Sequence, residues 1–349
     1  MKGDPLGGAL LLDDPRYLRF LADAHPHLEI SEARLEVPSF IAPLDVREPL
    51  LPGVTRALLQ VGAHLSPAHV TPPSLFLGTP FERYEQTHLV DNTADPEGLT
   101  GRARRFAEER GLELVVITCV SPHAEQLTAF IDAGFVALPS FPDTLVPLAT
   151  ADLDAHLLSL PPGDRSGIRR NIRRFERAGH RLERLSTSRR DAAALYEAYL
   201  PMFERATVKW YPHTPAYFEG VAELDERVRL TVARTRDGAL CGFVINFDDG
   251  DAFHAGRIGV SPGYYKKDAV YFRLLYHVLE ESLALGARRL VLEPTGYRMK
   301  RHLGARRRRL VNLVLGVSPS WRLLLSTMAG VGRRALSHLD RRRVLEGRY

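Results

Sequence analysis

The sequence predicts a mixed α/β (α+β) protein built of two similar domains in tandem, each with a mixed central sheet flanked by helices. Three observations predict this fold. The chain has 349 residues, which is more than one hydrophobic core usually serves. One pattern occurs twice: an amphipathic helix that ends at a glycine, an apolar strand, a second helix and another strand. A run of alternating residues with tight-turn signals, typical of hairpin-connected strands, precedes the second copy.

The first domain is expected to span residues 1–150. Its clearest part begins at residue 96, where apolar residues recur with helical spacing until Gly111. The apolar run "LELVVITCV" then predicts a buried strand, and a second helix ends at Gly134 before a further strand. We expect "DTLVPL", residues 143–148, to be the last strand of this domain.

The second domain is expected to span residues 151–317. It begins with a mostly helical region and continues with strands over residues 230–260, joined at Asp-Gly turns. The repeated pattern follows: a helix stopped by Gly286, the strand "RRLVLEP", a short helix that ends at "LGA", and the strand "VNLVL". Residues 318–349 are expected to form a basic amphipathic helical tail.

Charge is distributed unevenly along the chain. The formal net charge is +5, and the excess of arginine lies beyond residue 150. A basic half suggests a polyanionic partner: nucleic acid, nucleotide phosphates or an anionic membrane. Nearly every cation is arginine, so the few lysines are of special interest, because lysine can lose its proton when buried. The lysines are Lys2, Lys209, Lys266, Lys267 and Lys300.

Several classes of protein find no support in the sequence. Cys119 and Cys241 lie in apolar runs, which favours buried thiols in a reducing cytoplasm. The N-terminus lacks the pattern of a signal peptide, and no stretch approaches the roughly 20 apolar residues of a membrane helix. The motifs HExxH, CxxC, GxSxG and the P-loop are absent. We therefore expect a cytoplasmic protein with no metal site and no bound cofactor.

Four segments together carry a family resemblance: "RSGIRRNIRRFERAG", "FHAGRIGVSPGYY", "YFRLLYHVLEESLALGARRLVLEPTG" and "KRHLGARRRR". In this order they resemble the Fem-type (FemABX-like) aminoacyltransferase branch of the GNAT acyltransferase superfamily. The resemblance implies tandem GNAT-like domains, an active site in the second domain, N-acyltransferase activity that forms an amide bond, and aminoacyl-tRNA as the acyl donor.

Two departures from the resemblance matter. The long helical arm of some Fem-type members has no counterpart here. The pyrophosphate loop of acetyl-CoA-dependent GNAT enzymes, Arg/Gln-x-x-Gly-x-Gly/Ala, is replaced by "GYYKKDAVYF". Glycines in that loop let backbone amides approach phosphate, so their loss disfavours acetyl-CoA and agrees with a tRNA-linked donor.

Three residues are candidates for catalysis. Lys300 stands where the resemblance puts a lysine near the reacting carbonyl, and a fixed cation would stabilise the oxyanion. His254 lies on the expected central strand and is a candidate proton acceptor from the amine. Glu293 ends the strand "LVLEP" and is a candidate base or amine anchor. A surface lysine and a satisfied core histidine are the alternatives for the first two.

Other residues are candidates for binding substrate. Arg257, which strand alternation places on the face opposite His254, is expected to hold a carboxylate or phosphate of the acceptor. "GYYKKD" should open a helix, whose free amides and dipole attract anions. The loop "VKWYPHT" mixes a cation with aromatic rings. The candidates from these segments and the short helix after them are Tyr264, Tyr265, Lys266, Lys267, Tyr297, Lys209, Trp210 and Tyr211.

The arginine-rich helix carries a narrow apolar stripe, with Ile168, Ile172 and Phe175 at helical spacing, and two rows of cations. A solvated face, contact with the phosphates of tRNA or of a nucleotide-linked acceptor, and contact with a membrane are all compatible with this pattern. The candidate phosphate-binding residues are Arg165, Arg169, Arg170, Arg173, Arg174, Arg306 and Arg307.

The sequence therefore favours an N-acyltransferase that moves an aminoacyl group from tRNA to the amine of a peptidoglycan precursor or a small specialised metabolite. One alternative is an acyl-CoA-dependent transferase, in which Lys266 and Lys267 replace the glycine amides. The other is a non-catalytic module that binds RNA or an anionic envelope surface through residues 165–190 and 306–348.

Overall fold

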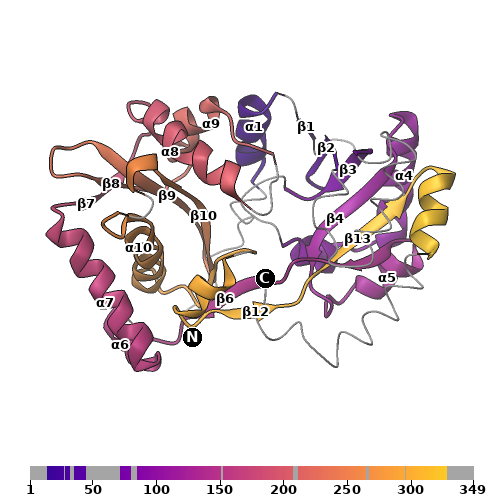
Figure 1. The fold of residues 1–349 in the computed structure, drawn as a ribbon. Helices are drawn as coiled ribbons and strands as arrows, with labels where there is room; N and C mark the ends of the chain where they lie inside the picture. The colour runs from indigo at the N-terminus through magenta and orange to yellow at the C-terminus, as the bar shows by residue number, and fades with distance from the viewer. Residues whose placement is uncertain are drawn as a thin grey trace, which may run out of the picture. The chain divides into compact units, whose positions relative to one another are not determined.

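The computed structural model describes residues 14–26, 28–31, 35–44, 71–79, 85–150, 152–206, 211–264, 267–294 and 296–327. The chain divides into two compact units, each assembled from separate stretches (Figure 1). Unit 1 comprises Met1–His27 and Thr144–Arg307, and unit 2 comprises Leu28–Asp143 and Arg308–Tyr349. The sequence, in contrast, predicts two continuous domains over residues 1–150 and 151–317, followed by a tail over residues 318–349.

Unit 2 contains a six-stranded mixed sheet of order β1-β2-β3-β4-β13-β5. Only β3 and β4 pair in parallel among the described ladders of this sheet. The strands are β1 (Glu29–Ser31), β2 (Ser39–Pro43), β3 (Pro73–Leu77), β4 (Leu114–Val120), β5 (Val136–Pro139) and β13 (Val311–Gly316). The helices are α3 (Thr87–Asn92), α4 (Pro96–Glu109) and α5 (Leu127–Asp132).

Helix α4 begins, ends and packs as the sequence pattern predicts. Asp95 caps its first turn by accepting a hydrogen bond from the Gly98 amide at 2.9 Å. Gly111, at φ +64°, follows its end and allows the left-handed turn into β4. The buried face of α4, including Leu99 and Ala103, packs on the apolar side chains of β4 and β13. The predicted helix and strand are confirmed.

Unit 1 contains a seven-stranded mixed sheet of order β12-β6-β11-β10-β9-β8-β7. Its strands are β6 (Asp143–Pro147), β7 (Arg181–Leu185), β8 (Val228–Arg234), β9 (Leu240–Asp249), β10 (Ala252–Val260), β11 (Arg289–Val291) and β12 (Arg306–Arg308). Its helices are α1 (Pro15–Ala24), α6 (Leu153–Ser159), α7 (Pro162–Arg177), α8 (Ala192–Arg205), α9 (Pro215–Gly220), α10 (Val270–Ala284) and α11 (Tyr297–Arg301).

Helices cover both faces of the unit 1 sheet. On one face, α10 buries Val270, Leu274 and Val278 against β9 and β10, together with Phe253. On the other face, α8 packs against the same two strands. Figure 1 shows α10 and α8 on opposite sides of β9 and β10. Strand β10 is thus central and buried, and its polar residues need specific partners.

Two strands differ from the expected assignment. Residues 143–147 were expected to end the first domain, but β6 pairs antiparallel with β11 of the unit 1 sheet. Residues 311–315 were expected in the second domain, but β13 inserts between β4 and β5 of unit 2. An apolar run indicates a buried strand, but not which sheet completes its hydrogen bonds. Each of the two predicted domains therefore contributes one strand to the sheet built mainly from the other.

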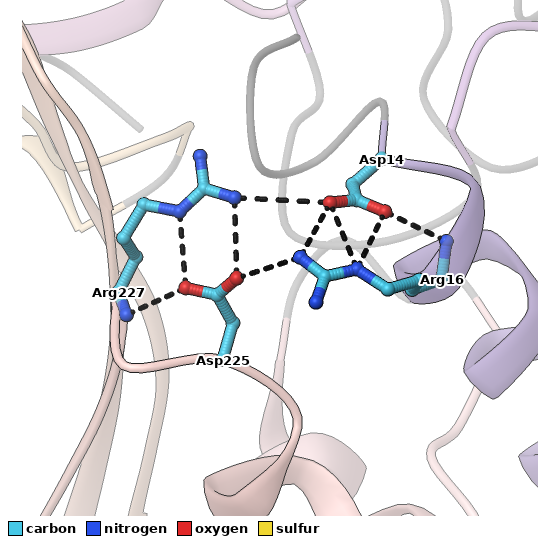
Figure 2. Close-up of polar contacts among 4 residues, drawn as sticks. All are labelled: Asp14, Arg16, Asp225 and Arg227. Atoms are coloured by element: carbon cyan, nitrogen blue, oxygen red, sulfur yellow. Dashed lines mark hydrogen bonds and ion pairs between the residues drawn. The ribbon is translucent and has the colours of Figure 1, made fainter. Parts of the chain in front are cut away.

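A network of four charged residues anchors helix α1 within unit 1 (Figure 2). Asp14 caps the helix by accepting from the Arg16 amide at 2.8 Å. Arg16 also reaches Asp225 at 3.1 Å, and Arg227 pairs with Asp225 at 3.0 Å. The hydrogen bond from the Arg16 side chain lowers the pKa of Asp14, and that from Arg227 lowers the pKa of Asp225.

The remaining expectations concern the thiols and the tail. Cys119 and Cys241 are both free and buried, and burial raises the pKa of the Cys241 thiol to about 11. Residues 319–327 are helical, with Trp321 and Leu325 buried, whereas residues 328–349 of the expected tail lie outside the described residues. Within the described part of the chain, no helix is long and apolar enough to cross a membrane.

Candidate active site

The site forms where two parallel central strands of unit 1 diverge. Strand β10 pairs with β11 through three residues, of which the last pair is His254 with Val291. β11 then ends, while β10 continues to Val260. A β-bulge interrupts β10 between Ala255 and Arg257. We call this region the strand fork, defined by residues 254–257 of β10 and 292–294 after β11. Bulges of this kind re-aim side chains next to functional sites.

The bulge corrects the predicted orientation of His254 and Arg257. Simple alternation placed these side chains on opposite faces of the sheet. In the observed register, His254 is opposite Phe247 and Arg257 is opposite Ile245 on β9. Phe247 and Ile245 are two residues apart and share a face, so His254 and Arg257 also share a face. The extra residue in the bulge brings both candidates to the side of the sheet that α8 covers.

Arg257 and Glu293 approach each other across the fork. Arg257 Nη1 lies 3.9 Å from Glu293 Oε2, and both side chains are largely buried. Glu293 has a left-handed backbone at φ +62°, which costs of order 1–3 kcal/mol for a non-glycine residue. A strained backbone, a buried cation and a buried carboxylate therefore meet at one point, which is a common arrangement in functional sites.

Lys300 holds the backbone on the Glu293 side of the fork. Its buried Nζ donates to the carbonyl oxygens of Leu292, Glu293 at 2.9 Å and Pro294 at 3.0 Å. The Thr144 hydroxyl donates to the Glu293 carbonyl at 2.6 Å. An ammonium group has three N–H donors, and all three are directed to backbone here. This geometry makes Lys300 a support of the Glu293 segment, and its role near a reacting carbonyl stays a prediction.

His254 is buried on β10. Its Nε2 lies 3.9 Å from Asp249 Oδ2, and the Asp249 side chain is almost completely buried. This carboxylate could stabilise a histidine that had accepted a proton. His254 and Glu293 are thus both candidate proton acceptors, one on each side of the fork.

Sequence reasoning missed two histidines behind Arg257. Arg257 Nε donates to His213 Nε2 at 3.0 Å, and His213 Nδ1 lies 3.3 Å from His25 Nε2. His25 comes from the N-terminal segment, 188 residues away from His213. His213 lies in the loop "VKWYPHT", which the sequence singles out for its cation and aromatic rings, but no signal in the sequence pairs this histidine with His25.

The segment before α10, which was expected to attract an anion, already contains a carboxylate. Asp268 and Ala269 both have left-handed backbones, at φ +56° and +59°. The Asp268 carboxylate accepts from His180 Nε2 at 3.1 Å. A carboxylate already stands at the start of α10, where the helix dipole would attract an anion. Lys267 Nζ lies 5.4 Å from the centre of the Tyr264 ring, and Tyr265 and Lys266 lie outside the described residues.

Helix α7 has the predicted amphipathic character. Ile168 and Phe175 are buried, and Ile172 packs against the same core. The candidate cations Arg169, Arg170, Arg173 and Arg174 are exposed, and Arg165 is half-buried. Arg169 pairs with Asp154 at 3.0 Å. The exposed side chains of Arg170, Arg173 and Arg174 add positive charge to the surface of α7. That this surface binds the phosphates of tRNA stays a prediction.

The last candidates come from α11, β12 and the segment "VKWYPHT". Arg307 stacks on the Tyr297 ring at 4.4 Å, and Arg306 is exposed on β12. Burial raises the pKa of the Tyr211 phenol. Lys209 and Trp210 lie outside the described residues. Among the residues that the structure describes, no group of histidine, cysteine and acidic side chains could hold a metal ion.

Residues 163–301 match the family model described as "Acetyltransferase (GNAT) domain". This segment is similar to GNAT acetyltransferase domains. It contains Arg257 on one strand of the fork, and Glu293 and Lys300 on the other side. The match supports an acyltransferase and agrees with the resemblance found in the sequence.

Solved structures extend the similarity of fold over nearly the whole chain. FemX has a TM-score of 0.57 at 12% identity, covering 92% of this chain and 95% of that chain. L-PGS from Bacillus licheniformis has a TM-score of 0.52 at 14% identity, covering 93% and 98%. The C-terminal domain of a putative lysylphosphatidylglycerol synthetase from Agrobacterium fabrum has a TM-score of 0.53 at 13% identity, covering 91% and 92%.

The two mixed sheets and these neighbours confirm the predicted tandem GNAT-like fold. No curated protein matches the sequence.

Proposed function

We propose that the protein is a GNAT-type N-acyltransferase that takes an aminoacyl group from aminoacyl-tRNA and transfers it to the amine of an acceptor. The observation that carries the choice of donor is the carboxylate of Asp268, held by His180 at 3.1 Å immediately before α10. A CoA pyrophosphate placed there would meet this negative charge. An ester-linked aminoacyl-tRNA needs no pyrophosphate at that position.

The strand fork supplies the groups that acyl transfer requires. The amine nitrogen attacks the ester carbonyl carbon, a C–N bond forms, and the C–O bond to the terminal ribose of tRNA breaks. The amine loses a proton, which Glu293 or His254 would accept, and the ribose oxygen gains one. Arg257 would hold an anionic group of the acceptor beside Glu293, from which it lies 3.9 Å away. The ester is already activated, so positioning and proton transfer are sufficient chemistry.

The acceptor is best described by its chemistry: an amine close to a carboxylate or phosphate that Arg257 can bind. A peptidoglycan precursor and a small specialised metabolite both meet this description. The name of the Agrobacterium neighbour points to a lipid acceptor for that protein. Vesicles that contain phosphatidylglycerol are therefore a necessary third acceptor in any assay.

The exposed arginines of α7 would hold tRNA through its phosphates. Like charges one helical turn apart, such as Arg169 and Arg173, destabilise a helix by a few tenths of a kcal/mol each. A bound polyanion would remove this penalty. Binding through phosphates weakens steeply with salt, because the polyanion's condensed counterions are released on binding.

The deciding experiment measures binding of the purified protein to charged and uncharged total tRNA across a salt series, followed by transfer of the labelled aminoacyl group to each acceptor. We expect salt-sensitive binding and transfer from charged tRNA. A protein that ignores tRNA, is stabilised against heat by CoA thioesters and transfers their acyl group would overturn this proposal in favour of the acyl-CoA alternative.

A matched pair of variants tests the α7 surface. Arg173→Glu on α7 should lower the affinity for tRNA and reduce the slope of log K against log salt by about one or more. Arg105→Glu makes the same charge change at an exposed arginine of α4 in unit 2. Equal losses in the two variants would mean that net charge alone, rather than the α7 surface, controls binding.

A further inference from the structure

We propose that His25 and His213 are positioning residues that fix the Arg257 guanidinium in the strand fork, so that helix α1 is a working part of the site. The proposal rests on the proposed function only in assigning Arg257 to the acceptor. The hydrogen-bonded chain itself is argued from geometry. The chain runs from the Leu21 carbonyl through His25 and His213 to Arg257, and we call it the histidine chain.

The two ends of the histidine chain fix the protons within it. At one end, the Leu21 carbonyl can only accept, and His25 Nδ1 lies 3.0 Å from it. At the other end, Arg257 Nε can only donate, and it lies 3.0 Å from His213 Nε2. His25 must therefore carry its proton on Nδ1, and His213 must leave Nε2 unprotonated. His213 Nδ1 then donates to His25 Nε2 at 3.3 Å. Both histidines are neutral and share one tautomer.

Packing holds the two rings in place. His25 is 0% exposed and His213 is 1% exposed. The His213 ring stacks on Tyr217, with centroids 3.9 Å apart and an angle of 21° between the rings. The His213 amide donates to the Tyr199 hydroxyl at 3.0 Å. A ring fixed by stacking and by its own backbone can aim a hydrogen bond precisely.

Helix α1 is fastened at both ends, which explains how a residue from the start of the chain can serve a site in the second half. At its start, Asp14 and Arg16 join Asp225 and Arg227 (Figure 2). At its end, His25 is the C-cap residue, and the Thr214 hydroxyl donates to the Ala24 carbonyl. Thr214 follows His213 directly, so one short segment both holds the end of α1 and contributes His213 to the histidine chain.

The consequence for Arg257 is a defined orientation. With Nε committed to His213, the planar guanidinium presents its other nitrogens toward the fork, where Nη1 lies 3.9 Å from Glu293 Oε2. A free arginine side chain loses substantial rotamer entropy when it binds a substrate. The histidine chain would remove this cost in advance, which favours a lower KM for the acceptor.

Protonation should break the histidine chain. A charged His213 would point an N–H at the Arg257 N–H and place two cations side by side. Among the described residues, the titratable and charged groups that face His213 include His25 from α1, Tyr199 from α8, Tyr217 from α9 and Arg257 from β10. The carboxylate of Glu293 lies beyond Arg257. Acid should therefore weaken acceptor binding through His213.

The test uses the full-length protein and two substitutions at one position. His213→Gln keeps an acceptor for Arg257 and a donor for His25, whereas His213→Leu removes both. We expect KM for the acceptor to rise about tenfold or more in His213→Leu, with a smaller change in kcat, and to be largely restored in His213→Gln. The acid-side rise of KM should be lost in His213→Gln, because glutamine does not titrate. His277→Gln, a change at a histidine bonded to Thr231 on the α10 face, should leave KM unchanged.

A second measurement does not depend on any substrate. Nitrogen-15 NMR of the ring nitrogens should show neutral His25 and His213, both protonated on Nδ1, near pH 7. A charged His213, or one protonated on Nε2, would overturn the proposal even if aminoacyl transfer is found. The expected tautomers without aminoacyl transfer would contradict the proposed function while leaving the histidine chain intact. Equal KM for His213→Leu and wild type would also overturn the proposal.

Discussion

Both units have a pair of parallel strands that stop pairing at one point, and a strained residue follows at the same distance. In unit 1, Glu293 lies two residues beyond Val291, the last residue of β11 paired with β10. In unit 2, Cys119 lies two residues beyond Ile117, the last residue of β4 paired with β3. Their φ angles are +62° and +54°.

The two positions differ in chemistry. The carboxylate of Glu293 faces Arg257. The Cys119 thiol lies 3.4 Å from the Ser140 hydroxyl, and β3 and β4 carry no charged side chain. Each backbone is held by a buried polar side chain: Lys300 in unit 1, and Asn312, which accepts from the Cys119 amide at 2.8 Å, in unit 2. The comparison teaches that a strained backbone can occur in both units while only one of the two positions carries charged side chains. Charge, and not strain alone, therefore marks the unit 1 fork as the candidate site.

The largest expected effect is on the rate of acyl transfer, and it should follow substitution of Glu293 but not of Cys119, the equivalent position in unit 2. Glu293→Gln keeps the size of the side chain but loses the carboxylate, and it should lower the rate of acyl transfer about 100-fold or more if Glu293 is the base. Cys119→Ser should leave the rate within about twofold of wild type. Steady-state kinetics with saturating acceptor measures both. A comparable loss in Cys119→Ser would mean that unit 2 also contributes chemistry.

Lys300, which holds the backbone at Glu293, should contribute more to the free energy of unfolding than Asn312, which holds the backbone at Cys119. Lys300→Met removes donors to three carbonyls and should lower the free energy of unfolding by about 3 kcal/mol. Asn312→Leu removes one acceptor of the Cys119 amide and should cost about 1–2 kcal/mol. Urea unfolding of each variant provides the comparison. If Lys300→Met were as stable as wild type yet inactive, Lys300 would act on the reacting carbonyl rather than on the backbone.

The smallest effect concerns the fastening of α1. The pKa values of Asp14 and Asp225 are lowered in the folded protein by their hydrogen bonds to Arg16 and Arg227. Their contribution is therefore present above the unfolded pKa of about 4 and is lost as the pH falls through the lower folded values. Amide hydrogen exchange should show α1 losing protection below about pH 4, and Asp225→Asn should reduce this pH dependence.

Helix α4 in unit 2 serves as the internal control for that measurement, because its apolar face packs into the core. If α1 and α4 lost protection together, acid would be unfolding the whole chain and not releasing α1.

The sequence predicted what depends on local pattern. The spacing of Leu99, Ala103 and Ala107, followed by Gly111, predicts α4, and the same logic predicts α10. Arg257 and Glu293 became candidates because charged residues interrupt or end apolar strands, whereas Lys300 became one through the family resemblance and the rarity of lysine. The bulge that puts His254 and Arg257 on one face could not be predicted, because no residue marks it.

Long-range partners were also beyond the sequence. His25 and His213 meet only because α1 packs into unit 1, and nothing near either residue encodes that contact. The resemblance singled out Lys300, but its bonds to three backbone carbonyls become visible only in three dimensions.

The exchange of strands has a consequence for how the protein is made. Strand β13 lies between β4 and β5 and pairs with both, so the sheet of unit 2 has two open edges until the final part of the chain has been synthesised. At about 5–20 residues per second, the ribosome delivers β13 roughly ten to thirty seconds after β5. During that time, the apolar edges of β4 and β5 can pair with other chains. We therefore expect the unit 2 sheet of a nascent chain to be prone to pairing with other chains until β13 has been synthesised.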